Sequence, residues 1–85
     1  MEMKKTNIDD LLIFKPSVFE DERGFFFEVY RRDVFKDLGL HVEFVQDNHS
    51  RSAFGIVRGL HFQWEPPMGK LMRVTRGKGF LVAVD

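Results

Sequence analysis

The chain has 85 residues, 44% of them hydrophobic and 14% aromatic, which is enough for one small domain that leaves much apolar surface uncovered. Its 13 Lys and Arg residues balance 13 Asp and Glu residues without a block of like charge, which argues against non-specific binding to nucleic acid or a membrane surface. The absence of cysteine excludes a disulfide framework and a thiolate metal site. Residues 1–10 are polar and contain no apolar run of signal-peptide or membrane-spanning length, so a cytoplasmic protein is the default expectation.

Short apolar stretches separated by turn residues predict an all-β chain with one short helix. No repeat or linker interrupts the sequence, so residues 1–85 are expected to belong to a single domain. The predicted strands, in chain order, cover residues 11–14, 25–30, 42–50, 56–63, 71–76 and 80–85.

Local signals define the first turn and the helix. Residues 20–24 read as a polar turn in which Gly24 can take a positive φ angle. Residues 31–38 place Val34, Phe35 and Leu38 at helical spacing, and Gly39 follows as a C-terminal cap. This is the one helix that the sequence predicts.

The last predicted strand, residues 80–85, is apolar and has no turn after it. Such a strand needs neighbours on both sides. We therefore expect that the chain is truncated within a domain.

The densest polar stretch covers residues 46–52 and is followed closely by Arg58–Gln63. Amides, a guanidinium and an imidazole on strand ends could line a polar pocket in the mouth of a small β-barrel. The alternative is that these are ordinary polar strand ends that cap a sheet edge, and spacing alone favours this alternative.

His61 lies between Leu60 and Phe62, so in a strand its side chain faces away from theirs. It is either an interior histidine with satisfied polar atoms, the more frequent case, or a general base near neutral pH. The other histidines, His41 and His49, lie on separate segments and no His-x-His pair occurs, so no metal site is expected.

Arg58 is the arginine best placed to meet a bulky anion, because the adjacent Gly59 has no side chain. Strict alternation puts Arg58 and His61 on opposite faces, so the strand must bulge or twist near Gly59 if both serve one ligand. Lys70 is not preceded by a Gly-x-x-x-x-Gly-Lys pattern and is a candidate only by its neighbourhood.

Five motifs are specific as a set: residues 21–28 (DERGFFFE), 44–50 (FVQDNHS), 57–63 (VRGLHFQ), 69–74 (GKLMRV) and 82–85 (VAVD). In order and spacing they closely resemble the first half of the dTDP-4-dehydrorhamnose 3,5-epimerases. The resemblance implies a cupin-type jelly roll that forms a homodimer by sharing strands. It also implies inversion of C3 and C5 in a dTDP-linked 4-keto-6-deoxyhexose, in the biosynthesis of dTDP-L-rhamnose or a related deoxysugar.

The same resemblance assigns roles to residues. It implies catalysis without a cofactor, since the 4-keto group acidifies both neighbouring C–H bonds. By this match His61 is the base, Lys70 stabilises the enolate oxygen and Arg58 contacts the substrate near its diphosphate. The nucleotide-binding residues implied are Arg23, Glu28, Gln46, Asp47 and Asn48.

The resemblance also implies what these 85 residues lack. Members of the family are about twice as long, and the carboxylate that orients the histidine and the proton-donating tyrosine lie in their second half. Tyr30, the one tyrosine here, does not match that position. We expect that 85 residues alone are not a competent epimerase, and two alternatives stay open: a non-catalytic module that binds dTDP-sugars or serves assembly, and a relative that acts at one centre.

Overall fold

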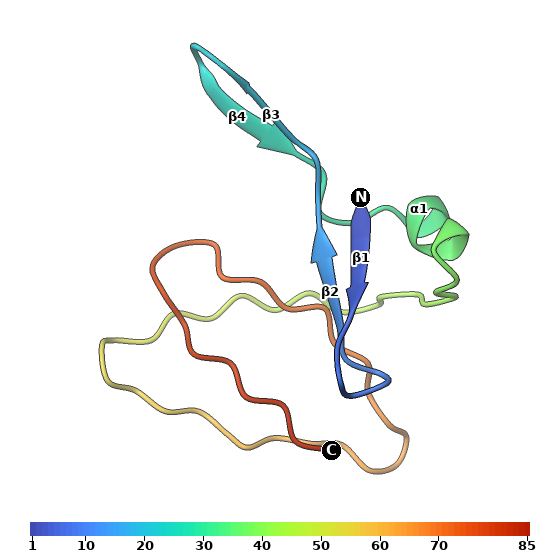
Figure 1. Cartoon of the computed structure of the whole chain (residues 1–85). Helices are drawn as coiled ribbons and strands as arrows, with labels where there is room; N and C mark the ends of the chain where they lie inside the picture. Colours follow the sequence, from blue (N-terminus) through green and yellow to red (C-terminus); the bar gives the residue numbers. More distant parts are fainter. The chain divides into compact units, whose positions relative to one another are not determined.

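The computed structural model describes residues 1–85. Its regular structure consists of four short strands in two antiparallel pairs and one short helix (Figure 1). The chain divides into two compact units, a first unit of Met1–Asp47 with Ala83–Asp85 and a second unit of Asn48–Val82. All strands and the helix lie in the first unit.

Strands β1 (Glu2–Lys5) and β2 (Leu12–Lys15) pair with Met3 opposite Phe14. Met3, Leu12 and Phe14 share one half-buried face, whereas the intervening residues are exposed. The prediction of β2 is confirmed with a shift of one residue. Strand β1 was not predicted, because its sequence has a single apolar residue among charges and therefore no apolar alternation.

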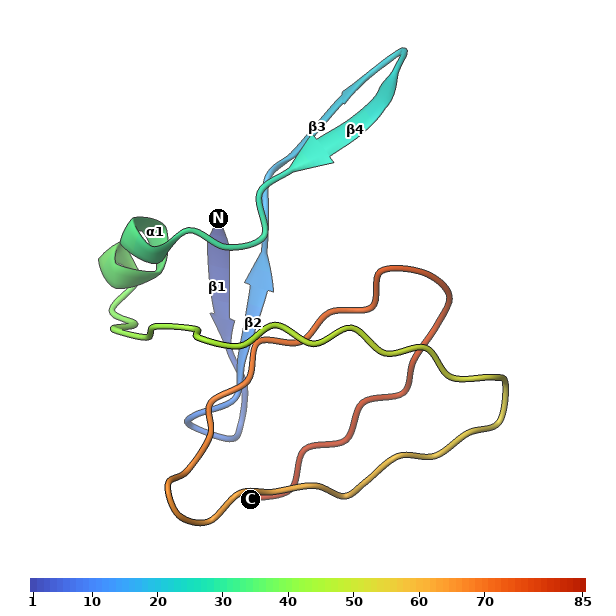
Figure 2. The ribbon, with the colours of Figure 1, turned by 180° about the vertical axis from the view of Figure 1, so that it is seen from behind.

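Strands β3 (Val18–Asp21) and β4 (Gly24–Phe27) form a hairpin that stands apart from the β1–β2 pair in both views (Figures 1 and 2). Gly24 has a φ of 129°, and no residue other than glycine has a positive φ. The turn therefore places its positive φ on Gly24, as the sequence predicted, and leaves Glu22 and Arg23 in ordinary conformations. The predicted strand over residues 25–30 is shorter than expected.

Helix α1 (Arg32–Asp37) confirms the helix prediction, and it ends in a Schellman motif. The Gly39 N–H donates to the Lys36 carbonyl and the Leu40 N–H donates to the Phe35 carbonyl, both at 2.9 Å. Gly39 has a φ of 88°, which a glycine adopts without the steric cost of a Cβ. The helix is too short to cross a membrane, and no other helix is present.

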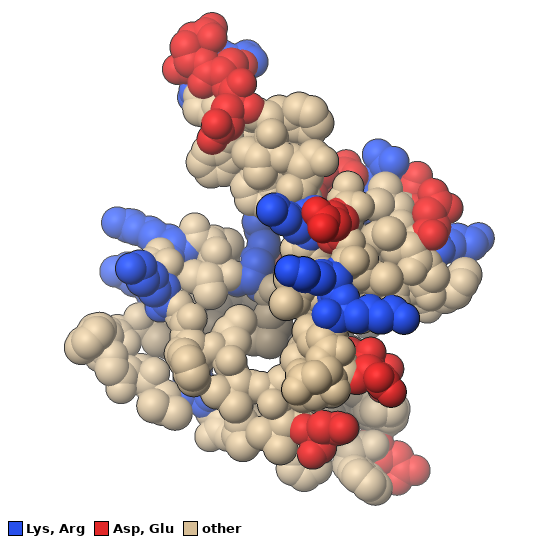
Figure 3. Space-filling model, in the orientation of Figure 1, with Lys and Arg blue, Asp and Glu red and all other residues tan.

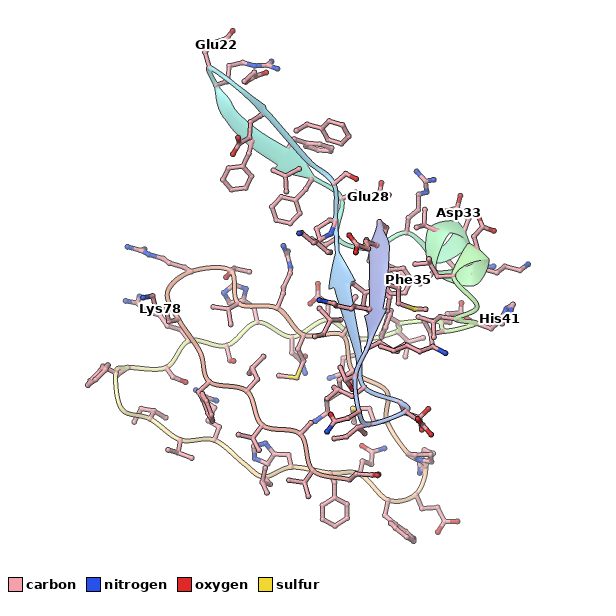
Figure 4. The ribbon with its side chains drawn as sticks, in the orientation of Figure 1. Glu22, Glu28, Asp33, Phe35, His41 and Lys78 are labelled. Atoms are coloured by element: carbon pink, nitrogen blue, oxygen red, sulfur yellow. The ribbon has the colours of Figure 1, made fainter.

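The core of the first unit forms around Phe35, which is 1% exposed and is the one fully buried side chain. Its ring stacks on Phe14 at 4.6 Å between centroids and meets the edge of Tyr30 at 4.8 Å. Tyr30 in turn contacts Phe44 at 5.0 Å, again edge to face. This aromatic cluster joins β2, α1 and the segment after the helix. Figure 4 labels Phe35, the buried ring at its centre.

No strand forms beyond residue 40, so the predictions for residues 42–50, 56–63, 71–76 and 80–85 are wrong for this structure. Apolar alternation shows which side chains can face a core, but a strand also needs a neighbour that accepts its hydrogen bonds. In the second unit the large apolar side chains are instead exposed, among them Val57 at 91%, Phe62 at 84% and Trp64 at 82%. In the second unit these segments therefore have neither ladder partners nor a covered apolar face.

We predict that Phe35→Ala lowers the free energy of unfolding by about 3–5 kcal/mol, because it removes the buried ring that β2 and Tyr30 pack against. Urea denaturation measures the change. Lys36→Ala is the matched control on the same helix and should change the free energy by less than about 0.5 kcal/mol. Equal effects of the two substitutions would show that Phe35 is not the centre of this core.

Candidate functional site

Arg23 lies at the tip of the β3–β4 hairpin and is bound by a residue of the same turn. Its backbone N–H donates to Asp21 Oδ1 at 2.8 Å, and its Nε and Nη2 donate to Asp21 Oδ2 at 3.1 and 2.6 Å. The Arg23 side chain is 85% exposed. Acidic residues gather at this tip around the arginine (Figure 3). A phosphate that binds Arg23 must therefore compete with the Asp21 carboxylate.

The side-chain hydrogen bond from Arg23 holds the pKa of the Asp21 carboxyl below its ordinary value, and the backbone hydrogen bond from Arg23 lowers it further. Since the folded pKa lies below the unfolded one, this interaction stabilises the hairpin above the unfolded pKa. The stabilisation is lost as the pH falls through the lowered folded pKa. The turn is therefore held most firmly when Asp21 is ionised.

Glu28 lies just after β4 and faces a small hollow of about 140 Å³, which it shares with Pro16, Ser17, Phe19 and others. Its Oε1 is 3.6 Å from Arg31 Nη1, so this carboxylate also has a cationic neighbour in the first unit. The hollow is smaller than the roughly 300–1,000 Å³ of typical ligand pockets. By itself it cannot enclose a nucleotide.

Gln46 and Asp47 are the last residues of the first unit's N-terminal segment, two and three residues after Phe44. Both residues are exposed, and Gln46 has interaction partners of its own. Asn48, another nucleotide-binding candidate, is the first residue of the second unit and also has interaction partners. The predicted site residues are thus distributed over both units.

In the second unit, Arg58 joins the two polar stretches that the sequence singled out. Its Nε donates to Ser52 Oγ at 2.8 Å and its Nη2 donates to the Arg51 carbonyl at 3.1 Å. Both bonds bridge six or seven residues along the chain. The guanidinium is thereby oriented, although it remains exposed.

Gly59 has a φ of 115°. No strand forms over residues 56–63, so the bulge that a strand would need for Arg58 and His61 to serve one ligand stays a prediction. A Cβ at Gly59 would lie 3.5 Å from the His61 backbone nitrogen and 3.9 Å from its Nδ1. The imidazole therefore lies close to the glycine, and the positive φ rather than crowding requires glycine here. Lys70 is exposed in the same unit.

One hollow was not predicted. It has a volume of about 240 Å³ and is lined by Arg32, Lys36, Leu40, His41, Val42 and Glu43. The signal in the sequence was the i, i+4 spacing of two basic residues on the helix, followed by a histidine after its cap. The hollow contains none of the predicted site residues, and no group of three or more His, Cys, Asp or Glu side chains is placed to hold a metal ion.

The family model described as dTDP-4-dehydrorhamnose 3,5-epimerase matches residues 5–85. The chain belongs to this family. Every predicted site residue falls inside the match, from Arg23 to Lys70.

Among curated proteins, the chain is 54% identical over 81 residues to the dTDP-4-dehydrorhamnose 3,5-epimerase of Methanothermobacter thermautotrophicus, covering 95% of this chain and 44% of the relative. It is 56% identical over 87 residues to the enzyme of that name from Shigella flexneri, covering 100% of this chain and 48% of the relative. A dTDP-4-dehydrorhamnose 3-epimerase from Streptomyces niveus is 34% identical over 87 residues, covering 100% of this chain and 42% of the relative. The chain thus spans about half the length of the curated relatives that it matches, and no solved structure matches it significantly.

We predict that the Asp21 carboxyl titrates below its ordinary pKa of 3.8 because Arg23 donates to it. NMR detection of the carboxyl carbon during an acid titration measures this value. In Arg23→Gln the Asp21 pKa should rise towards the ordinary value, whereas in the control Arg31→Gln it should stay low. A pKa of Asp21 that is the same in both variants would contradict the hairpin geometry.

Proposed function

We propose that the chain is part of a dTDP-4-dehydrorhamnose 3,5-epimerase, which acts on a dTDP-linked 4-keto-6-deoxyhexose and inverts C3 and C5. The observation that supports this most strongly is the family match over residues 5–85, together with identities above 50% to epimerases of that name. The match includes all the residues to which we assign roles. The proposal requires no cofactor.

The reaction that we propose begins with removal of a proton. The imidazole of His61 takes the proton from the carbon next to the 4-keto group, and the electron pair of the C–H bond moves through the new C=C bond onto the ketone oxygen. The ammonium group of Lys70 stabilises the resulting enolate oxygen. Delivery of a proton to the opposite face restores the ketone with inverted configuration, and the same steps at the second carbon complete the product.

The proton donor for the opposite face is not assigned to this chain. Tyr30 cannot be proposed for it, because its ring packs against Phe35 and Phe44 in the aromatic cluster. In the proposed enzyme, the donor and the carboxylate that orients His61 come from the part of the family's length that does not align with these residues.

The substrate's nucleotide and diphosphate are held, in this proposal, by Arg23, Glu28, Gln46, Asp47, Asn48 and Arg58. Arg58 supports the assignment best, since its hydrogen bonds to Ser52 and the Arg51 carbonyl orient a guanidinium that stays exposed for an anion. Arg23 would exchange the Asp21 carboxylate for a phosphate, so that one charge-assisted pair replaces another.

The proposal includes a cupin-type jelly roll and a homodimer. The β3–β4 hairpin supports an assembly in which other polypeptide segments cover both of its faces. Phe19 and Phe26 are paired on one face, and Phe25 and Phe27 stack on the other with 5.7 Å between ring centroids. Phe19, Phe25 and Phe26 are all more than 60% exposed. An isolated two-stranded hairpin is marginal in water, so such a ribbon gains stability when both faces are covered.

Inversion at a single centre is the second candidate, since the Streptomyces niveus relative is named as a 3-epimerase. That relative is 34% identical, against 54% and 56% for the two 3,5-epimerases. The difference favours action at both centres. Solvent deuterium at C3 alone would favour the 3-epimerase function instead.

We predict that the enzyme of which this chain is proposed to be part incorporates solvent deuterium at C3 and C5 of the dTDP-linked 4-keto sugar, and that His61→Ala slows this exchange by roughly 10²–10⁴-fold. NMR of the recovered sugar nucleotide measures both positions. The affinity for dTDP should change by less than about twofold, because the base contacts the sugar and not the nucleotide.

His41→Ala serves as the control, since it removes an imidazole to which we assign no role and should leave the exchange unchanged. If the enzyme that contains this chain labels neither carbon, the epimerase proposal is refuted. A large loss of dTDP affinity in His61→Ala would instead show that His61 is a structural residue.

A further inference from the structure

We propose that Tyr30 is a positioning residue for the nucleotide-binding pair Gln46 and Asp47. This inference rests on the proposed function, which supplies the ligand for that pair. Tyr30 lies between β4 and helix α1 and makes three contacts. Its ring meets Phe35 at 4.8 Å and Phe44 at 5.0 Å, both edge to face, and its hydroxyl donates to the Val42 carbonyl at 3.5 Å.

Two of these three contacts fall on the segment that leads to the pair. Residues 41–50 form no helix, strand or turn, so regular backbone hydrogen bonding does not fix their course. Within this segment Phe44 is half-buried, whereas its neighbour Val45 is 90% exposed. Phe44 is therefore the apolar side chain by which the segment is attached to the first unit.

Attachment at Phe44 determines where the following residues lie. Gln46 and Asp47 follow Phe44 by two and three residues, so the short chain between them ties both residues to the place where Phe44 packs on Tyr30. By holding Phe44, Tyr30 therefore positions the amide and the carboxylate.

Tyr30 is a better candidate for this role than the ion pair that also reaches the segment. Arg32 Nη1 lies 3.7 Å from Glu43 Oε1, but both side chains are 74% exposed. Solvent screens such a pair, and its contribution is small. Tyr30 is half-buried and also packs against Phe35, the one fully buried residue, so its position is fixed by the core.

The test compares Tyr30→Leu with Phe14→Leu by calorimetric titration with dTDP. Both substitutions remove one aromatic contact with Phe35, but only Tyr30→Leu also removes the contact with Phe44. We expect Tyr30→Leu to weaken dTDP binding by roughly tenfold, the scale of one lost aromatic pair, with the number of sites unchanged. Phe14→Leu should lower the melting temperature comparably and leave the affinity of the folded protein within about twofold.

Tyr30→Phe should restore normal affinity, because it keeps both ring contacts and loses only a hydrogen bond at the limit of bonding distance. The inference is overturned if Tyr30→Leu binds dTDP as tightly as the unmodified protein, or if Phe14→Leu loses as much affinity.

A second readout needs no ligand and separates the two proposals. NMR order parameters for the backbone of residues 44–47 should fall in Tyr30→Leu and not in Phe14→Leu. If the unmodified protein fails to bind dTDP, the proposed function fails, while this comparison still supports or overturns the positioning role. Unchanged order parameters in Tyr30→Leu would overturn it.

Discussion

The ring of Phe35 packs against Phe14 on one strand and Tyr30 ahead of the helix, and the first unit is organised by these two contacts. The helix presents Phe35 to them because it ends sharply at a Schellman motif closed by Gly39. Since Tyr30 also contacts Phe44, the same core directs the chain towards Gln46. The course of a segment without regular structure thus depends on one buried ring through a single intermediate side chain.

The two arginines that we assign to phosphate groups differ in what binds them. The guanidinium of Arg23 is paired with a carboxylate, so binding a phosphate there exchanges one anion for another. Arg58 donates to a hydroxyl and a carbonyl, which orient it and leave its positive charge uncompensated. Electrostatic attraction for a diphosphate is therefore greater at Arg58. Arg23 binds a phosphate only if its side-chain hydrogen bonds to Asp21 in the turn are broken.

Local sequence predicted local structure well. The apolar spacing of residues 34–38 with Gly39 predicted the helix and its cap, and Gly24 predicted the position of the hairpin turn, because these signals act within a few residues. The strands predicted beyond residue 40 did not form, since a strand depends on distant neighbours that its own sequence does not contain. Strands β1 and β3 were missed because their sequences, EMKK and VFED, lack the alternation that marks a half-buried strand.

The candidate site was predicted in part for the same reason. The sequence singled out Gly59 between Arg58 and His61, and this glycine has a positive φ, but no strand forms around it in which a bulge could be tested. The pairing of Arg23 with Asp21 was not anticipated, although a carboxylate two residues before an arginine in a tight turn is a readable signal. The link from Tyr30 to Phe44 joins residues that are separated by a helix, and no pattern in the sequence indicates it.

The central claim, that these residues form the nucleotide-binding part of an epimerase, is tested most directly by mapping dTDP onto the isotope-labelled protein with NMR. The account predicts that the resonances of Arg23, Glu28, Gln46, Asp47, Asn48 and Arg58 shift as dTDP is added. Shifts confined to the basic hollow lined by Arg32, Lys36 and His41, or no shifts at millimolar dTDP, would contradict it.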